Sequence, residues 1–230
     1  MALLTTEDIR RLRRRLDQGG VAVIPTDTVY GLACAPEDTG AVRRLYALKG
    51  RPPDKPAAVL FFTLTEALGA LPELGPRTRG ALTRLLPGAL TVVLANPGGH
   101  YPAAGGLDPP TLGLRVPALG ATPALAALAA VTGPVLQSSA NHAGGADARR
   151  LSDVPPDIRA GADIVLDAGE LPGTPSTVVD LRGFEDDGAW CVLRAGALAP
   201  AELEMALEGI YVDPRGPPTT PPQGRSRRSD

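Results

Sequence analysis

The chain has few cysteines, histidines and aromatic residues: two Cys, two His and 3% aromatics among 230 residues. Cys34 and Cys191 are isolated and stand in apolar contexts, so we expect buried free thiols in place of a metal cage. His100 and His142 have no carboxylate or cysteine at ligand spacing, which favours loop or surface histidines. No protein-bound metal is therefore predicted. The scarcity of aromatics also counts against a surface that stacks single-stranded nucleic acid.

Long apolar runs and a strong net charge are absent as well. No stretch approaches the roughly 20 apolar residues of a membrane span, and the first residues lack the charged and apolar regions of a signal peptide. The formal net charge is −2, so anion binding must come from local clusters of Arg and Lys. These features predict a cytoplasmic protein without membrane association.

The remaining composition is that of an ordinary globular protein, with 43% hydrophobic and 21% charged residues. The length fits one domain. Strand and helix patterns alternate without an internal repeat, which favours an α/β domain with a twisted, mixed parallel and antiparallel sheet and flanking helices over a barrel. We expect this domain to span residues 1–212. Residues 213–230 are rich in Pro, Arg and Ser and are predicted to be disordered.

Periodicity and capping residues place the individual elements. A Thr-x-x-Asp start predicts a first helix over 5–20, and Asp38 or Thr39 can cap a second helix that ends at Lys49. Further helices are expected over 65–71, 77–86, 122–131 and 200–208. Strands are expected over 21–24, 57–62, 90–95, 112–116, 135–137, 164–166, 177–181 and 191–193.

One face of the first helix is rich in arginine. It carries Arg10, Arg11, Arg13, Arg14 and Arg15. A solvated face is the preferred interpretation, and a nucleic-acid patch is the alternative.

Two motifs suggest a site for a phosphorylated ligand. Lys49-Gly50-Arg51 places two cations at the end of a helix, and Arg is well suited to phosphate or carboxylate oxygens. Ser138-Ser139-Ala140-Asn141 places hydroxyl and amide groups just after a buried strand. The alternatives are an exposed helix exit for Arg51 and ordinary turn chemistry for Ser139 and Asn141.

Further motifs occur in a fixed order around this pair: PTDTVYGL at 25–32, LPGALT at 86–91, LRVP at 114–117, PSTVVD at 175–180 and LRAG at 193–196. The whole set resembles the YrdC/Sua5 family of L-threonylcarbamoyladenylate synthases, over roughly residues 6–210. The resemblance implies a single YrdC-like domain with a concave ligand cleft. Some members carry a second domain, and this chain resembles the short, single-domain type.

The resemblance also implies a reaction. ATP, L-threonine and bicarbonate or CO2 would form threonylcarbamoyl-AMP and pyrophosphate, with Mg²⁺ accompanying ATP, for N6-threonylcarbamoyladenosine modification of tRNA. The partners implied are these substrates and the downstream tRNA threonylcarbamoyl-transfer proteins, with a weak tRNA contact left open. Neither a Gly-x-x-x-x-Gly-Lys-Ser/Thr loop nor a Gly-x-Gly-x-x-Gly fingerprint is present, so nucleotide binding must use another architecture.

Residue roles carry over onto matching positions. The resemblance makes Lys49, Arg51, Ser139 and Asn141 catalytic and places them, with Lys55, Thr111 and Arg194, around ATP. Thr28, Arg115 and Ser176 match threonine-binding positions.

Each of these roles has an alternative. Lys55 could be merely solvated, and the Thr and Ser hydroxyls could bond their own backbone. An Arg inside a strand is costly unless paired, which makes Arg115 the best carboxylate clamp. Asp27 could orient a cation or cap a loop.

Some positions depart from the family. Leu60 stands where many members have a His that helps hold threonine, and His142-Ala143-Gly144 replaces the usual Leu-Ser-Gly after the Ser-x-Asn motif. These departures bear on amino-acid selectivity. Two rival functions stay open: a nonenzymatic RNA-binding module, and carbamoyl-adenylate chemistry on another acceptor.

Overall fold

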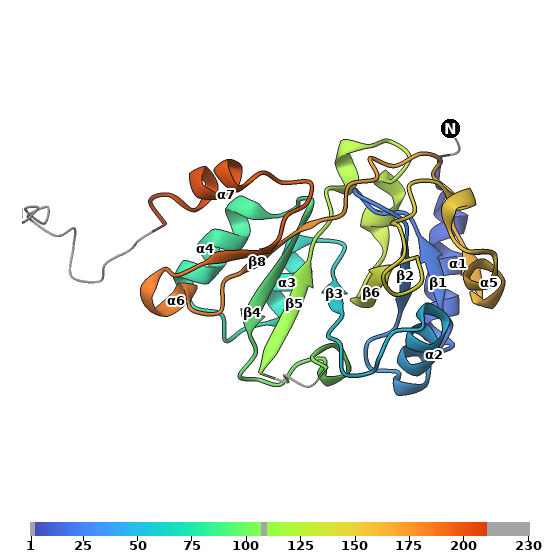
Figure 1. Cartoon of the computed structure of the whole chain (residues 1–230), viewed down its shortest axis with the longest axis horizontal. Coiled ribbons are helices and arrows are strands. Elements are labelled where there is room, and N and C mark those ends of the chain that lie inside the picture. Colours follow the sequence, from blue (N-terminus) through green and yellow to red (C-terminus); the bar gives the residue numbers. More distant parts are fainter. Residues whose placement is uncertain (1–2, 107–109, 211–230) are drawn as a thin grey trace, which may run out of the picture.

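The computed structural model describes residues 3–106 and 110–210, and they build one mixed sheet (Figure 1). The sheet has nine strands in the order β7-β1-β2-β6-β3-β5-β4-β8-β9. Their bounds are β1 Ala22–Ile24, β2 Gly31–Cys34, β3 Ala58–Leu60, β4 Leu90–Ala95, β5 Thr111–Arg115, β6 Val135–Ser139, β7 Ile164–Val165, β8 Thr177–Asp180 and β9 Cys191–Arg194. Parallel pairs are β1/β7, β3/β5 and β4/β8, and the other neighbours are antiparallel. The predicted mixed α/β sheet is confirmed.

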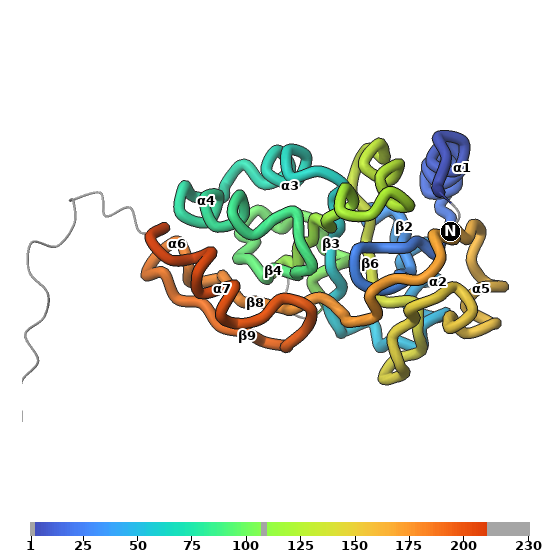
Figure 2. The backbone as a smooth tube through the Cα atoms, turned by 90° about the horizontal axis from the view of Figure 1, so that it is seen from above, coloured from blue at the N-terminus to red at the C-terminus, as the bar shows by residue number. Residues whose placement is uncertain are grey.

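Helices flank this sheet on both sides, as the view from above shows (Figure 2). They are α1 Thr6–Asp17, α2 Thr39–Lys49, α3 Leu64–Ala70, α4 Pro76–Leu85, α5 Pro156–Gly161, α6 Phe184–Asp187 and α7 Pro200–Leu207. Short 3-10 turns lie at Pro102–Ala104, Leu119–Ala121, Ala126–Ala130 and Leu151–Asp153. The expected tail, 213–230, lies outside the described residues. No helix in the described part of the chain is long and apolar enough to cross a membrane.

The predicted caps of the first two helices are confirmed. Thr5 and Asp8 form a reciprocal capping box at the start of α1, and the Asp38 carboxylate accepts from two backbone N–H groups at the start of α2. Gly50 ends α2 in the left-handed conformation, with φ of 60°. Lys49 therefore occupies the last turn of α2, as expected.

Several expectations about elements were wrong. No α-helix covers 122–131: only the 3-10 turn Ala126–Ala130 forms within this range, and no side chain caps its start. Strand β2 and the short helices α5 and α6 were not predicted. The four residues of β2 are all buried, and a short apolar run gives no alternation to detect.

The two thiols differ. Cys34 is buried in β2, as predicted, but Cys191 is exposed. The prediction for Cys191 was wrong because β9 is an edge strand of the sheet, whose side chains have less to pack against.

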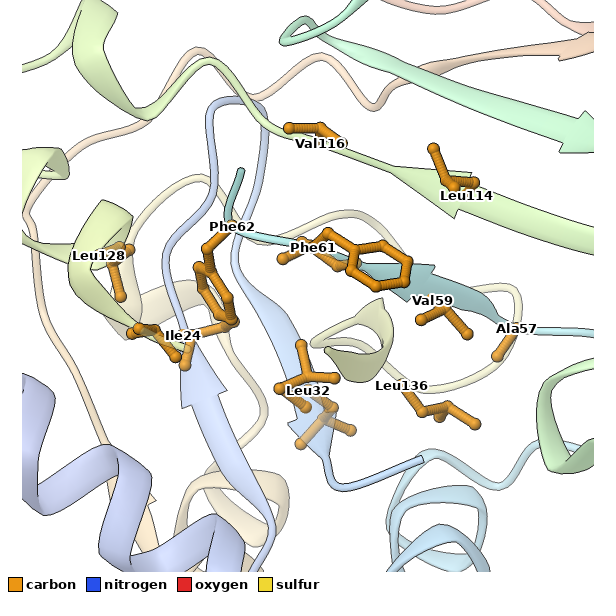
Figure 3. Close-up of a cluster of buried hydrophobic side chains, with 14 of the residues drawn as sticks. Ile24, Leu32, Ala57, Val59, Phe61, Phe62, Leu114, Val116, Leu128 and Leu136 are labelled. Carbon is orange, nitrogen blue, oxygen red and sulfur yellow. The ribbon is translucent and has the colours of Figure 1, made fainter. Parts of the chain in front are cut away.

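The core lies between the sheet and its helices and consists mainly of Leu, Val and Ala, as the composition predicts. Phe61 and Phe62, just after β3, are the largest side chains in the cluster that Figure 3 shows, and they lie among aliphatic residues such as Ile24 and Leu136. Leu60 is fully buried. The position at which the resemblance implies a histidine in many members thus belongs to the apolar interior of this chain.

The arginines on α1 are largely paired with acidic residues of the same helix. The pairs are Arg10 with Glu7 at 3.5 Å, Arg11 with Asp8 at 3.7 Å and Arg13 with Asp17 at 2.7 Å. Exposed pairs of this kind contribute little stability, but they neutralise local charge. The arrangement suits the solvated face preferred from the sequence.

Candidate functional site

A cleft of about 270 Å³ is lined by residues of the neighbouring strands β6, β3, β5, β4 and β8. It contains six of the residues predicted from the sequence, which come from motifs spread over most of the chain: Arg51, Thr111, Arg115, Ser139, Ser176 and Arg194. Three guanidinium groups and several hydroxyls therefore line one concave surface, which suits anionic oxygen atoms. Lys55 is exposed, and its side chain is not part of the cleft lining.

Arg51 is held at the exit of α2 by its neighbours. Its backbone N–H donates to Tyr46 O at 2.9 Å, and its Nη2 donates to the carbonyl oxygen of Pro56. The guanidinium carbon also lies 6.0 Å from the centroid of the Tyr46 ring. These contacts use part of the guanidinium and leave the rest facing the cleft.

Lys49 connects the end of α2 to the turn after β6. Its ammonium donates to Ser139 O at 2.7 Å and Oγ at 3.2 Å, and to Asn141 Oδ1 at 2.7 Å and O at 2.9 Å. The residue is only 2% exposed. Burial, reinforced by Arg51, lowers the pKa of Lys49 to about 8, and the negative charge of Asp147 opposes that shift. Lys49 does not line the cleft and instead holds the Ser-x-Asn turn in place.

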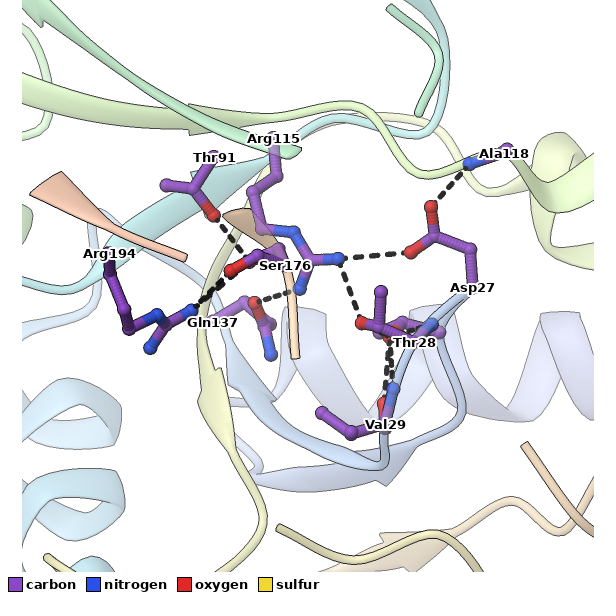
Figure 4. A network of polar contacts seen from close by, with 10 residues as sticks. Asp27, Thr28, Val29, Thr91, Arg115, Ala118, Gln137, Ser176 and Arg194 are labelled. Carbon is purple, nitrogen blue, oxygen red and sulfur yellow. Dashed lines mark hydrogen bonds and ion pairs between the residues drawn. The ribbon is translucent and has the colours of Figure 1, made fainter. Parts of the chain in front are cut away.

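Arg115 is the centre of a buried polar network on the cleft floor (Figure 4). Its Nη2 donates to Asp27 Oδ1 at 3.0 Å and Thr28 Oγ1 at 3.2 Å, and its Nη1 donates to Gln137 Oε1 at 3.1 Å. Asp27 also accepts from the backbone N–H of Ala118 at 2.9 Å. Asp27 thus performs both roles considered for it, pairing with a cation and capping a loop.

The network leaves Arg115 with fewer free donors than an open carboxylate clamp would have. Its Nε is buried without a partner among the described residues. Burial lowers the pKa of Arg115, while Asp27 acts against that shift. Burial also raises the pKa of Asp27 above its usual range, although Arg115 and the Ala118 N–H both act to lower it. The pair must therefore be considered as one unit.

A third cluster of the cleft lining consists of Arg194, Ser176 and Thr91. Arg194 Nη2 donates to Ser176 O at 2.7 Å, and the Ser176 and Thr91 hydroxyls are hydrogen-bonded at 2.9 Å. Gly196 allows this packing, because a Cβ there would lie 2.4 Å from Pro175 O. The glycine of the LRAG motif thereby lets the segment after β9 lie directly on the PST segment.

Among the polar side chains of the cleft lining, sequence reasoning gave no role to Thr91, Gln137 and Asp147. Thr91 ends the LPGALT motif at 86–91, so its position in that motif could have identified it as a site residue. Gln137 and Asp147 carried no such signal, because their roles depend on neighbours from distant strands and loops. Asp147 is the carboxylate among the lining residues.

The described residues, 3–106 and 110–210, contain no group of three or more His, Cys, Asp or Glu side chains that could hold a metal ion. His100 and His142 each lie in a loop, with Glu73 at 3.1 Å and Asp157 at 3.2 Å respectively. Each histidine therefore pairs with an acidic side chain, and a pair supplies fewer ligands than a metal centre needs.

Comparison with known proteins agrees with this geometry. The Sua5/YciO/YrdC family model, described as telomere recombination, matches residues 14–196. The threonylcarbamoyl-AMP synthase of Stutzerimonas stutzeri is 34% identical over 181 residues, which is 77% of this chain and 94% of that protein. The one from Pyrococcus abyssi is 30% identical over 200 residues, covering 86% of this chain and 56% of that protein.

A solved structure shows the same fold. The crystal structure of P. abyssi Sua5 complexed with L-threonine matches with a TM-score of 0.78 at 28% identity, covering 93% of this chain and 61% of that chain. The chain spans 56% and 60% of the length of the P. abyssi and Bacillus subtilis synthases. The ordered motifs, the shared sheet and the match over residues 14–196 show that the chain belongs to the Sua5/YciO/YrdC family.

Proposed function

We propose that the chain synthesises threonylcarbamoyl-AMP from L-threonine, bicarbonate and ATP, releasing pyrophosphate and water, for N6-threonylcarbamoyladenosine formation in tRNA. The observation that carries the proposal is the single cleft that unites the basic and hydroxyl residues of the family motifs. Relatives named threonylcarbamoyl-AMP synthase support it. The product would pass to downstream proteins that transfer the threonylcarbamoyl group to tRNA, in the cytoplasm.

The chemistry requires positive charge where negatively charged groups meet. The amine of threonine is first carboxylated, and a carbamate oxygen then attacks the α-phosphorus of ATP while the bond to pyrophosphate breaks. Arg51 and Arg194, at different parts of the cleft wall, are placed to stabilise the developing charge on phosphate oxygens. Mg²⁺ would enter with ATP as part of the substrate, and Thr111 would contact the nucleotide.

The turn after β6 would hold the reacting oxygens. Ser139 faces the cleft, and its Oγ donates to Asn141 Oδ1 at 2.6 Å. Lys49 fixes both residues by four contacts with their oxygens. We assign Ser139 the direct contact with phosphate or carbamate oxygens, with Asn141 and Lys49 maintaining its position.

The buried end of the cleft would hold threonine. Arg115 and Ser176 line it, and Thr28 contacts Arg115. Leu60 is fully buried and does not line the cleft, so its side chain would not contact the amino acid. Lys55 is exposed, so any contact it makes with nucleotide would be with a part of ATP that extends out of the cleft.

The test is pyrophosphate release from ATP by the purified chain, with threonine or bicarbonate omitted in turn and the product identified by mass spectrometry. We expect release to require both co-substrates. Release without threonine would point to carbamoyl-adenylate chemistry on another acceptor. If no release occurs and RNA is bound, the nonenzymatic RNA-binding function is correct and the proposal is wrong.

A further inference from the structure

Gln137 lies in β6 with its carboxamide on the cleft floor, only 4% exposed. A guanidinium group can only donate hydrogen bonds, so the amide must present its oxygen to Arg115. It does so, with Oε1 3.1 Å from Nη1. The NH₂ group must then point away from Arg115, as Figure 4 shows. The orientation of this amide is therefore set by chemistry.

The neighbouring strand makes room for that NH₂ group. A Cβ at Gly31 of β2 would lie 2.4 Å from Gln137 Nε2. Any other residue at position 31 would displace the amide and disturb its bond to Arg115. Nε2 makes no hydrogen bond to a described residue, yet it is not among the fully buried unpartnered atoms there. It is therefore a donor without a partner among the described residues, and it is not fully enclosed.

The charge around Arg115 indicates which ligand group this donor would serve. Asp27 pairs with Nη2 of Arg115 at 3.0 Å, so much of the positive charge is already compensated. A carboxylate bound beside Arg115 would need an additional donor that brings no further charge. Gln137 supplies one from a fixed orientation on the same floor.

We propose that Gln137 is a specificity-determining residue that donates from Nε2 to the carboxylate of the amino-acid substrate. This rests on the proposed function and names the group by which the substrate is recognised. Because the donor is neutral and Arg115 is already paired, replacing the amide by an acid should exclude a carboxylate ligand while sparing a neutral one.

The experiment compares wild type with Q137E and Q137L, and uses Q18E as a control because Gln18 is exposed and ends α1 far from the cleft. L-threonine and L-threoninamide are titrated calorimetrically, and KM values for threonine and ATP are taken from pyrophosphate release. We expect Q137E to weaken threonine binding at least tenfold and threoninamide less than threefold. Q137L should raise the KM for threonine about tenfold and leave that for ATP within twofold.

Equal losses for threonine and threoninamide in Q137E, or a parallel rise in the KM for ATP, would reduce Gln137 to a structural role and overturn the inference. An unchanged threonine affinity in Q137E would do the same. If wild type itself releases no pyrophosphate with threonine and does not bind it, the proposed function fails. If wild type is active and Q137E has a normal KM for threonine, the inference about Gln137 is wrong and the proposed function stands.

Discussion

The ammonium of Lys49 donates to both Oδ1 and O of Asn141, at 2.7 and 2.9 Å, and so ties the last turn of α2 to a turn 92 positions later in the sequence. The two motifs that suggested a phosphate site are therefore one structural unit. Removing the ammonium would leave four oxygens of Ser139 and Asn141 without their shared donor. Lys49 is accordingly expected to act by positioning.

Activity should decline as pH rises through about 8, because the protonated ammonium of Lys49 organises the turn and its pKa is lowered to about 8. Stability should change in the opposite direction. The unfolded chain binds more protons than the folded chain between the folded and unfolded pKa values of Lys49, so this group's contribution to the free energy of unfolding rises with pH there. The slope is at most about 1.4 kcal/mol per pH unit.

The variant K49M isolates the contribution of Lys49 to the pH dependence of stability. The free energy of unfolding of wild type minus that of K49M should increase as pH rises above about 8, the pKa of Lys49. Urea titrations of both proteins at several pH values check this. A constant difference across that range would show that Lys49 titrates normally, and the alkaline loss of activity would then need another group.

R51A should abolish adenylate formation while leaving the fold intact. Arg51 lies at a helix exit, where its guanidinium bonds the loop carbonyls of Lys55 and Pro56 and faces the cleft, so little of the core depends on it. Loss of one donor to a developing oxyanion costs about 2–4 kcal/mol of transition-state stabilisation. The measurement is kcat/KM for pyrophosphate release, with melting temperature as a check on folding.

R14A is the matched control, because Arg14 is an exposed arginine on α1. It should retain wild-type kinetics. Activity of R51A within a factor of two of wild type would rule out the role assigned to Arg51.

Local chemistry made much of the fold predictable. The caps at Thr5 and Asp38 and the strand at 90–95 could be predicted because they depend on a few adjacent residues. The failures share a different cause. Cys191 has an apolar context, but its exposure depends on β9 being the sheet edge, and no local pattern reports strand order.

The site shows the same division. Arg115 could be recognised as a paired arginine, because a strand interior does not tolerate an unpaired one. Its partners could not be identified, since Asp27 and Gln137 come from segments 88 and 22 positions away. Likewise, the exposure of Lys55 depends on how the 50–56 segment leaves α2, which the KGR motif alone does not determine.

The two cysteines should react with a thiol reagent at very different rates. Cys34 is buried, and burial raises the pKa of its thiol to about 12, so almost no thiolate is present near neutral pH. Cys191 is exposed on the edge strand. A colorimetric disulfide reagent should therefore label one thiol quickly and the second only after denaturant is added. C191S should remove the fast phase and C34S the slow one.

The last prediction concerns the Arg115–Asp27 pair, in which both side chains are nearly buried and lie 3.0 Å apart. D27N removes one charge at nearly constant shape and leaves the Arg115 guanidinium buried without its counter-ion. Breaking a buried pair from one side costs about 3–5 kcal/mol, whereas removing both partners costs less than the sum of the single losses. We therefore expect the double variant D27N/R115M to be more stable than the two single variants predict together. Denaturant titrations of all four proteins measure this coupling, and strict additivity would contradict it.

R115K tests the ligand side of the same pair: a lysine keeps the charge but cannot reach Asp27, Thr28 and Gln137 together. The KM for threonine should rise at least tenfold in R115K while ATP affinity stays near that of wild type. Loss of ATP affinity with intact threonine affinity would instead place Arg115 in the phosphate site, and the floor of the cleft would then hold nucleotide.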